Sequence, residues 1–325
     1  MRCPKCGEEV DGLCLNCTNL NELVWLDDFI ITTCPRCGSF KVEGKWRVLD
    51  LEEVVDFLIS KLMRIHPELQ VKEIIVEYEP FTIRVLGKIS NTDVEVVKHP
   101  NLKIIKETCI RCSREAGGYY ESILQLRADG RALEKDEVER ANEIIEEVLL
   151  AEKNNQKAFV TKVVERREGI DYFFGGRDVG RKVSRKLINE FGGEIKESKT
   201  ISGRMDGRDL YRFTYLVRLP SYKNGDVVRE NGKICVVTNA KLKKAMDIKT
   251  KQTVTLKNPK LVVRKSRIKK GVVVQKDEYI VELIHPDTNE LIFAEKTAEF
   301  EIGDEVFVVE YNDKFYAIPS WLIIK

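Results

Sequence analysis

The chain has 325 residues, 43% of them hydrophobic and 33% charged, which is enough for roughly two to four domains with several cores. Its formal net charge is only +2. No stretch is long and apolar enough to span a membrane, and no apolar run follows Met1, so we expect neither a membrane protein nor a secretory signal peptide.

Eight of the nine cysteines lie in four C-x2-C pairs. Two thiolates at this spacing bind one metal from a tight turn, and two such pairs complete a tetrahedral four-sulfur site. Two of the pairs have the form Cys-Pro-x-Cys-Gly, in which proline fixes φ and glycine tolerates a positive φ after the second ligand. The predicted metal ligands are Cys3, Cys6, Cys14, Cys17, Cys34, Cys37, Cys109 and Cys112.

Eight ligands imply two metal ions. Seven residues separate Cys6 from Cys14, so we expect the first two pairs to share one site, because a short loop closes at low entropic cost. The third and fourth pairs then share the second site across a long insertion. We interpret both sites as structural zinc, since a closed four-cysteine site leaves no position for a substrate. An iron–sulfur cluster is the alternative, which the Cys-Pro-x-Cys-Gly turns disfavour. Paired cysteines without a signal peptide indicate a reducing cytoplasm rather than disulfides.

The insertion between the third and fourth pairs is predicted to be a small α/β element. A helix begins at Asp50, where Glu53 completes a capping box, and apolar residues recur at helical spacing as far as Ile65. A His-Pro step then ends the helix. Strands are predicted at 71–78, 81–89 and 93–97, after which the fourth cysteine pair closes the unit.

A second α+β unit is predicted to follow. Its expected strands are 119–126, 159–164, 194–201 and 210–219, and its expected helices are an acidic one at 133–153 and a basic one at 177–191. The basic helix carries apolar residues on one face and four bases on the other, a pattern that commonly contacts phosphates beside a sheet. The alternative is an ordinary exposed surface helix.

From Lys223 onward the pattern is all β. Strands at 225–228, 234–237 and 253–256 suggest a small SH3-like barrel, with Cys235 as a buried core thiol. Five further strands, at 272–275, 279–284, 291–294, 305–310 and 314–318, suit an OB-like barrel. A basic segment at 264–270 is expected between the two barrels.

Basic residues are concentrated in the middle of the chain. Residues 1–157 have a net charge of −7 and residues 273–325 one of −8, whereas residues 158–220 have +5 and residues 221–272 have +12. We interpret the middle as an RNA-binding surface rather than a solvated one, because residues 221–272 hold 15 bases and only three acids. The predicted RNA-binding residues are Arg177, Arg181, Lys182, Arg185, Lys186, Lys241, Lys243, Lys244, Arg264, Lys265, Arg267, Lys269 and Lys270.

The sequence offers no catalytic constellation. All three histidines precede proline and mark turns or helix ends, so a histidine general base is not expected. Residues 175–182 superficially resemble a phosphate-binding loop, but Arg181 stands where the lysine belongs and Lys182 where a hydroxyl should hold magnesium. We therefore predict that the protein is not an enzyme.

The cysteine spacing resembles that of the nonsense-mediated mRNA decay protein 3 family, the export adaptors of the large ribosomal subunit. Two N-terminal zinc sites, the second completed late by Cys109 and Cys112, are the most specific part of the likeness. Gly169–Phe174 and residues 225–228 also resemble this family, and the similarity covers nearly the whole chain. The resemblance implies that the eight cysteines bind zinc and that the barrels are similar to those of the hypusine-containing translation factor. It also implies binding to the joining face of the large subunit, across its tRNA sites.

These patterns predict a multidomain α+β protein. It should comprise a two-zinc, ribbon-type domain with an α/β insertion (1–125), a central α+β domain (126–220), an SH3-like barrel (221–263) and an OB-like barrel (264–325). We expect a cytoplasmic factor, monomeric away from the ribosome and without membrane contact, that binds rRNA and ribosomal proteins of the large subunit during maturation or quality control. Eukaryotic members continue into a shuttling tail, whereas this chain ends in a strand-like pattern, so the resemblance favours an archaeal-type factor. The alternatives are a zinc-ribbon RNA-modifying enzyme and a zinc-ribbon transcription factor that prefers duplex DNA.

Overall fold

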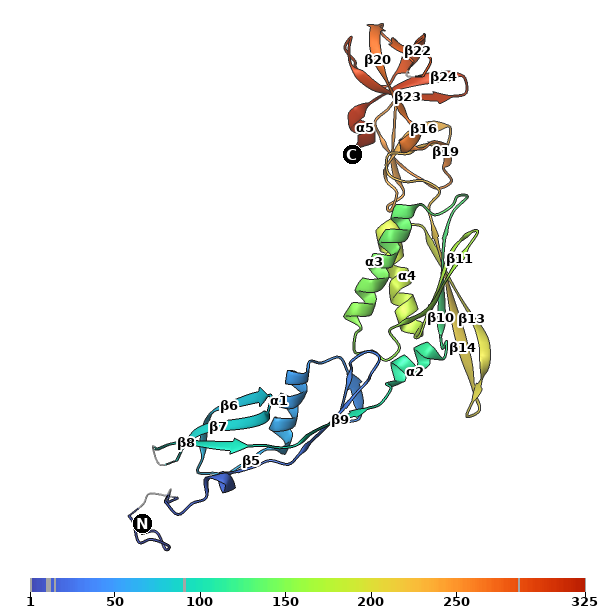
Figure 1. The fold of residues 1–325 in the computed structure, drawn as a ribbon. Helices are drawn as coiled ribbons and strands as arrows, with labels where there is room; N and C mark the ends of the chain where they lie inside the picture. Colours follow the sequence, from blue (N-terminus) through green and yellow to red (C-terminus); the bar gives the residue numbers. More distant parts are fainter. Residues whose placement is uncertain (1, 10–12, 15, 90–91, 286, 325) are drawn as a thin grey trace. The chain divides into compact units, whose positions relative to one another are not determined.

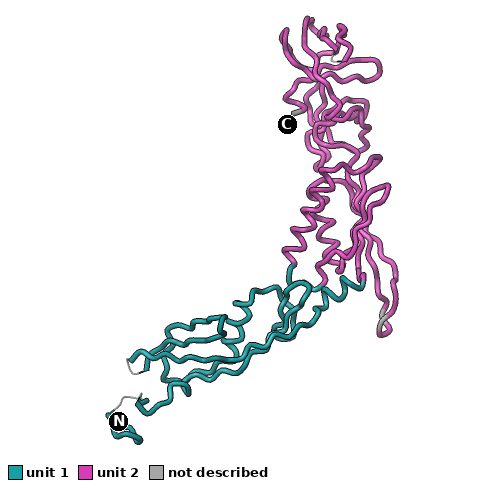
Figure 2. Tube along the Cα trace, in the orientation of Figure 1, with its two compact units in different colours: residues 1–117, 153–156 teal, residues 118–152, 157–325 magenta. Residues whose placement is uncertain are grey.

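The computed structural model describes residues 2–9, 13–14, 16–89, 92–285 and 287–324. The chain forms two compact units (Figure 2): unit 1 comprises residues 1–117 with 153–156, and unit 2 comprises residues 118–152 with 157–325. Both units combine helices and strands, so the predicted multidomain α+β class is confirmed. Within the described part of the chain, no helix is both long and apolar enough to cross a lipid bilayer.

Unit 1 is built from small sheets that bring the third and fourth cysteine pairs together. Its elements are η1 (Leu20–Leu23), β1 (Val24–Trp25), β2 (Phe29–Thr33), β3 (Phe40–Val42), β4 (Lys45–Arg47), α1 (Leu51–Leu62), β5 (Arg64–Ile65), β6 (Gln70–Tyr78), β7 (Phe81–Ile89), β8 (Thr92–Lys98), β9 (Leu102–Lys106) and α2 (Ile110–Ala116). The three predicted strands form the meander β6-β7-β8. β9 returns in parallel beside β2, and this pairing carries the chain back to the third cysteine pair.

The start of α1 follows the sequence prediction, whereas its end does not. Asp50 caps the helix, and its N–H donates to the Glu53 carboxylate at 2.9 Å, which completes the predicted capping box. The helix ends at Leu62, so the prediction that it extends through Ile65 is wrong. Arg64 and Ile65 instead pair with β1, and this strand pairing overrides the helical spacing of the apolar residues.

The first part of unit 2 is a five-stranded sheet with helices on one face (Figure 1). Its elements are β10 (Ser122–Ala128), α3 (Lys135–Ala151), β11 (Val160–Arg166), β12 (Gly169–Phe174), α4 (Arg177–Phe191), β13 (Glu194–Met205) and β14 (Arg208–Leu219). The strand order is β11-β12-β10-β14-β13, with β10 parallel to β14 and the other neighbours antiparallel. Helix α4 packs on the sheet, and α3 packs on α4. Leu124, Tyr172 and Tyr215 are buried in the core that this packing creates.

A buried ion pair fixes the start of α3. The Arg131 guanidinium donates two hydrogen bonds of 2.7 Å to the Glu137 carboxylate, and these side chains are only 8% and 5% exposed. Arg131 also donates to the carbonyl of Pro220, and Glu137 accepts the N–H of Glu134. Burial opposes ionisation of Glu137, but the Arg131 guanidinium and the Glu134 N–H outweigh it and hold the pKa of Glu137 below its usual range.

Replacing Glu137 with alanine is expected to destabilise this domain by about 3–5 kcal/mol, because Arg131 is then left charged and buried without its partner. Hydrogen exchange of the α3 amides measures the loss. Glu139→Ala is the control, since Glu139 is 62% exposed and pairs only with the exposed Lys135 among the described residues. Equal α3 protection in the two variants would contradict the role given to Glu137.

The same ion pair gives the domain a defined acid sensitivity. Because the pKa of Glu137 is lower in the folded state than in the unfolded state, its stabilisation is fully present above the ordinary glutamate pKa of about 4.3. The stabilisation disappears as the pH falls through the folded-state pKa. Protection of α3 in the wild-type chain should therefore decline below about pH 4.3 more than it does in Glu137→Ala.

The rest of unit 2 consists of two β domains. Their elements are β15 (Val227–Glu230), β16 (Lys233–Asn239), β17 (Lys244–Asp247), β18 (Thr253–Thr255), β19 (Lys260–Val263), η2 (Lys265–Arg267), β20 (Lys269–Lys276), β21 (Ile280–Ile284), β22 (Leu291–Lys296), β23 (Glu305–Tyr311), β24 (Lys314–Pro319) and α5 (Ser320–Ile324). The first domain is a sheet of order β18-β17-β16-β15-β19, in which Cys235 is fully buried as expected. β20-β21-β22-β24-β23 close into the five-stranded barrel predicted for the last part of the chain.

Two expectations for this region are wrong. β20 begins at Lys269, so Lys269 and Lys270 are part of the barrel rather than of a segment between barrels. Residues 321–324, which were expected to be strand-like, form most of α5, and Lys325 lies outside the described residues. Leu322 and Ile323 of this helix are buried in an apolar core to which both β domains contribute.

Candidate metal centres and nucleic-acid interface

The first two cysteine pairs form one cluster. The Sγ atoms of Cys3, Cys6, Cys14 and Cys17 all lie within 4.8 Å of one another, and those of Cys6 and Cys14 are 3.6 Å apart. The turn after Cys3 is closed by a 2.8 Å hydrogen bond from the N–H of Gly7 to the Cys3 carbonyl. Gly7 has a φ of +79°, the conformation for which glycine was expected at this position. The predicted grouping of these four cysteines is therefore confirmed.

The third and fourth pairs form a second cluster, although 71 residues lie between Cys37 and Cys109. All four Sγ atoms again lie within 4.8 Å of one another, and those of Cys37 and Cys109 are 3.6 Å apart. Cys34 follows β2, and Cys109 caps α2, just beyond the parallel partner β9. Backbone N–H groups of Cys109 and Cys112 point at the sulfurs of Cys34 and Cys109, respectively. The predicted pairing across the insertion is therefore confirmed.

The donor atoms of both clusters fit a tetrahedral metal ion. Four sulfurs at about 2.3 Å from a central zinc are about 3.8 Å apart, close to the 3.6 Å separations found here. Disulfides are not formed, since all the cysteines are free. With no open ligand position in a four-sulfur site, such ions would hold the fold together rather than bind a substrate.

Thiol ionisation in the first cluster also indicates a site for a cation. Backbone N–H groups of Cys6 and Lys5 lower the pKa of Cys3 to about 6, so one thiolate forms readily. The neighbouring Cys6 sulfur, together with burial, raises the pKa of Cys17 to about 12. Crowded sulfurs thus resist full ionisation on their own, whereas a divalent ion neutralises the thiolates and binds them.

The predicted RNA-binding face of α4 is partly neutralised by α3. Lys182 pairs with Glu152, and Lys186 pairs with Glu147 at 3.4 Å. Together α3 and α4 contain seven Lys or Arg and eight Asp or Glu. The sequence prediction treated the 177–191 helix by itself and so missed these partners, which lie some 30 to 39 positions away along the chain.

The remaining α4 bases differ from one another. Arg181 and Arg185 have no carboxylate partner in the described part of the chain, and Arg185 is exposed. The Arg177 guanidinium instead lies 4.3 Å from the ring centroid of Phe213 and 3.9 Å from the Glu197 carboxylate. Of the five bases predicted on this helix, Arg181 and Arg185 are thus the ones best placed to meet a phosphate.

The basic residues of the β domains also divide into those paired with a carboxylate and those without such a partner. Arg264 pairs with Asp226, whose carboxylate is only 4% exposed, while Lys269 pairs with Asp287 and Lys270 with Glu305. The candidates that are exposed and lack an ion pair among the described residues are Lys241, Lys243, Lys244, Lys265 and Arg267. The first three lie in and next to the turn between β16 and β17.

Features that resembled catalytic motifs have structural roles. The Nδ1 atom of His285 accepts hydrogen bonds of 3.2 Å from the backbone N–H groups of Asp287 and Thr288, so this histidine caps a turn. In the segment that resembled a phosphate-binding loop, Gly180 lets α4 pack closely on β10. A Cβ atom at this position would lie 2.4 Å from Ser122 Oγ. The glycine is thus required for packing.

Two models of known protein families match this chain, and the matched residues include both cysteine clusters and helix α4. A model described as "NMD3, N-terminal domain" matches residues 3–117, and one described as "NMD3, second domain" matches residues 119–219. A search among curated proteins found no match. Membership in this family implies an adaptor role in ribosomal subunit export or maturation, and such adaptors are generally not enzymes. Since the two matches cover more than half of its length and include both cysteine clusters, the chain belongs to the NMD3 family.

Proposed function

We propose that this protein is a non-enzymatic factor that binds the large ribosomal subunit during its maturation or quality control. The observation that carries the proposal is the pair of four-cysteine clusters inside the matched N-terminal domain, followed directly by the matched second domain. The family resemblance supports binding to the joining face of the subunit, across its tRNA sites. The basic middle of the chain supports rRNA as a large part of the bound surface.

Zinc is the metal proposed for both clusters, with a structural role. Four thiolates in a closed arrangement are the ligands of structural zinc sites, and Cys-Pro-x-Cys-Gly turns favour zinc over iron–sulfur clusters. Free rather than disulfide-bonded cysteines support a cytoplasmic location. We also propose that the protein is a monomer away from the ribosome.

The division into four domains is part of the proposal. The expected boundary between residues 125 and 126 falls inside β10, so we propose that the second domain begins before Ser122. An SH3-like assignment of the β15–β19 sheet rests on its short strands, of which β15 to β18 pair in sequence and β19 returns beside β15. An OB-like assignment of the last barrel is supported by its closure and by the parallel pairing of β22 with β24.

Among the basic candidates, we propose that those without a carboxylate partner contact rRNA phosphates most directly. A base already paired with an acid must give up that ion pair, which reduces the gain from binding a phosphate. The proposed contacts are Arg181, Arg185, Lys241, Lys243, Lys244, Lys265 and Arg267.

Sedimentation with purified subunits tests the proposal. The metal-loaded chain is expected to move with the large subunit on a sucrose gradient and to stay at the top with the small subunit. Turnover of nucleotide or methyl donor that a point mutation in this chain abolishes would support the enzyme alternative. Tighter binding to duplex DNA than to the large subunit would support the transcription-factor alternative.

A further inference from the structure

The sheet of the second domain has one face that the helices do not cover. Helices α3 and α4 lie against the opposite face (Figure 1). Side chains alternate along each strand, so neighbours of the buried core residues point away from the helices. Ile123, Phe173 and Leu216 are such outward residues, and each is only half-buried. We call this surface the open sheet face.

An aromatic and cationic cluster lies on the open sheet face. The rings of Tyr120 and Phe173 meet edge to face, with centroids 5.0 Å apart. The Arg212 guanidinium lies 4.2 Å from the centroid of the Tyr120 ring. Single-stranded RNA is commonly bound by such groups, because exposed bases stack on aromatic rings and on guanidinium planes.

The charge of the open sheet face complements a phosphate backbone. The strand registers place Lys162 beside Phe173, Arg212 beside Thr200, and Lys196 beside Leu216 on this face. These three bases are exposed, and none has a carboxylate partner in the part of the chain that the structure describes. The contrast with Lys182 and Lys186, which α3 neutralises on the other side of the domain, indicates that the open sheet face attracts anions more strongly.

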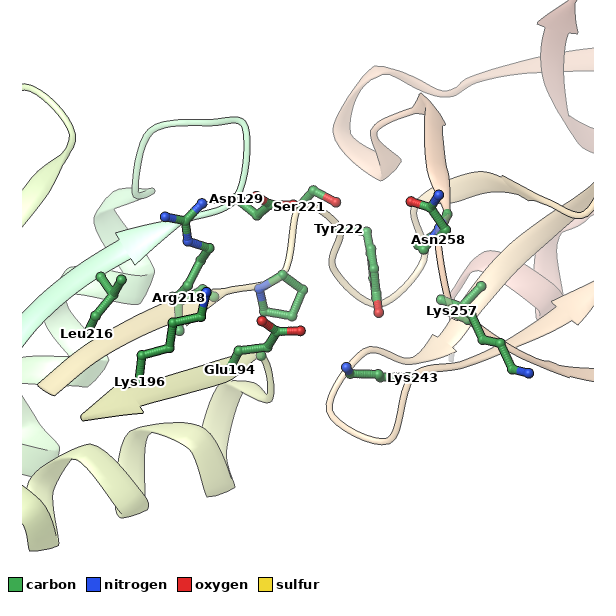
Figure 3. Close-up of a pocket in the computed structure, with 15 residues that line it drawn as sticks. Asp129, Glu194, Lys196, Leu216, Arg218, Ser221, Tyr222, Lys243, Lys257 and Asn258 are labelled. Atoms are coloured by element: carbon green, nitrogen blue, oxygen red, sulfur yellow. Dashed lines mark ion pairs between the residues drawn. The ribbon is translucent and has the colours of Figure 1, made fainter. Parts of the chain in front are cut away.

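The open sheet face leads into a pocket of about 320 Å³ at the end of β14 (Figure 3). This volume is at the small end of the range for ligand pockets, about 300–1,000 Å³. Lys196 and Leu216 belong both to the face and to the pocket wall, so the two surfaces are continuous. The following β domain supplies other lining residues, among them Tyr222, Lys243 and Lys257.

We propose that the open sheet face and this pocket bind a single-stranded segment of RNA. The phosphates lie over Lys162, Lys196 and Arg212, and a base stacks on the cluster of Tyr120, Phe173 and Arg212. A nearby nucleotide enters the pocket, where Lys243 meets its phosphate. Duplex RNA fits less well because its bases are already stacked on one another. The inference rests on the proposed function, since it names an RNA contact of the same factor.

Binding of a fluorescent 12-nucleotide single-stranded oligouridylate to the full-length, metal-loaded chain tests the charge part of the inference. Lys196→Gln with Arg212→Gln is expected to weaken binding and to lower the salt slope by about 1.4, since each lost contact to a single strand removes about 0.7. The control is Lys182→Gln with Lys186→Gln, which removes the same charge on the other side of the domain. It should leave the affinity and the slope unchanged.

Phe173→Leu tests the stacking part, because it removes the ring while keeping an apolar side chain. We expect roughly tenfold weaker binding of the single strand with an unchanged salt slope. A 12-base-pair duplex should bind more weakly than the single strand to the wild-type chain. Because Lys196 and Arg212 are exposed, their variant still decides the matter if Phe173→Leu perturbs folding.

Sedimentation with the large subunit separates failure of this inference from failure of the proposed function. If the wild-type chain moves with the subunit but the open-face variants bind the oligonucleotide as the wild type does, the inference is overturned and the proposed function stands. If the open-face variants lose the subunit but keep the oligonucleotide, the face contacts a ribosomal protein and the RNA assignment is wrong. If the wild-type chain binds the oligonucleotide but no subunit, the proposed function fails on its own.

Discussion

The purified chain is expected to contain two zinc ions, and Cys109→Ser is expected to contain one. Cys109 supplies a ligand to the second cluster and also caps α2, so its loss removes the metal and loosens the start of that helix. Structural zinc contributes roughly 10–16 kcal/mol of apparent binding energy in small peptides, which is larger than the stability of most domains. Elemental analysis of the metal content, with hydrogen exchange of α2, measures both effects.

Two further variants make this prediction specific. Cys3→Ser should also leave one zinc, because it breaks the first cluster and spares the second. Cys235→Ala should keep both ions, since Cys235 is buried in the first β domain and belongs to neither cluster. Iron in place of zinc, or a single ion in the wild-type chain, would contradict the assignment of two zinc sites.

The cysteine grouping could be predicted because it depends on local spacing. Seven residues between Cys6 and Cys14 allow a short loop, so the first two pairs can share one site. The third and fourth pairs must then form the second site together. The parallel pairing of β9 with β2, which brings Cys109 to Cys34, could not be read from the sequence. The prediction did not need this strand pairing, because two four-ligand sites already require the third and fourth cysteine pairs to share one metal ion.

Predictions of other features failed because those features depend on contacts between segments that are distant in the sequence. The end of α1 was misplaced since the pairing of Ile65 with Val24 decides it, and local spacing does not encode that pairing. The acids that neutralise Lys182 and Lys186 lie on α3 and at its C-cap, so a prediction made from α4 alone overestimates the attraction of this helix for RNA. The open sheet face was missed for the same reason, because Tyr120, Phe173 and Arg212 meet only through strand register.

Binding to the large subunit is expected to fall steeply as salt rises. Each neutralised phosphate releases condensed counterions, and about 6–10 contacts to duplex DNA lower the affinity by roughly 10³–10⁵ between 50 and 200 mM salt. RNA should change in the same direction with a different slope. The effect depends on bases that are not already paired with acids. Within the described part of the chain, Arg181, Arg185, Lys265 and Arg267 have no such ion pair.

Arg181→Gln with Arg185→Gln, and separately Lys265→Gln with Arg267→Gln, should each lower the salt slope of subunit binding by about one to two. Lys182→Gln with Lys186→Gln is the matched control, because α3 already neutralises these two lysines and their loss should change the slope little. Arg264 is left in place, since its removal would leave the buried Asp226 carboxylate without its ion-pair partner. A loss of binding could then not be distinguished from a loss of folding. If both test variants keep the affinity and slope of the wild-type chain, these bases are only a solvated surface. Recognition of the subunit must then lie elsewhere, in the acidic, metal-binding end or on the open sheet face.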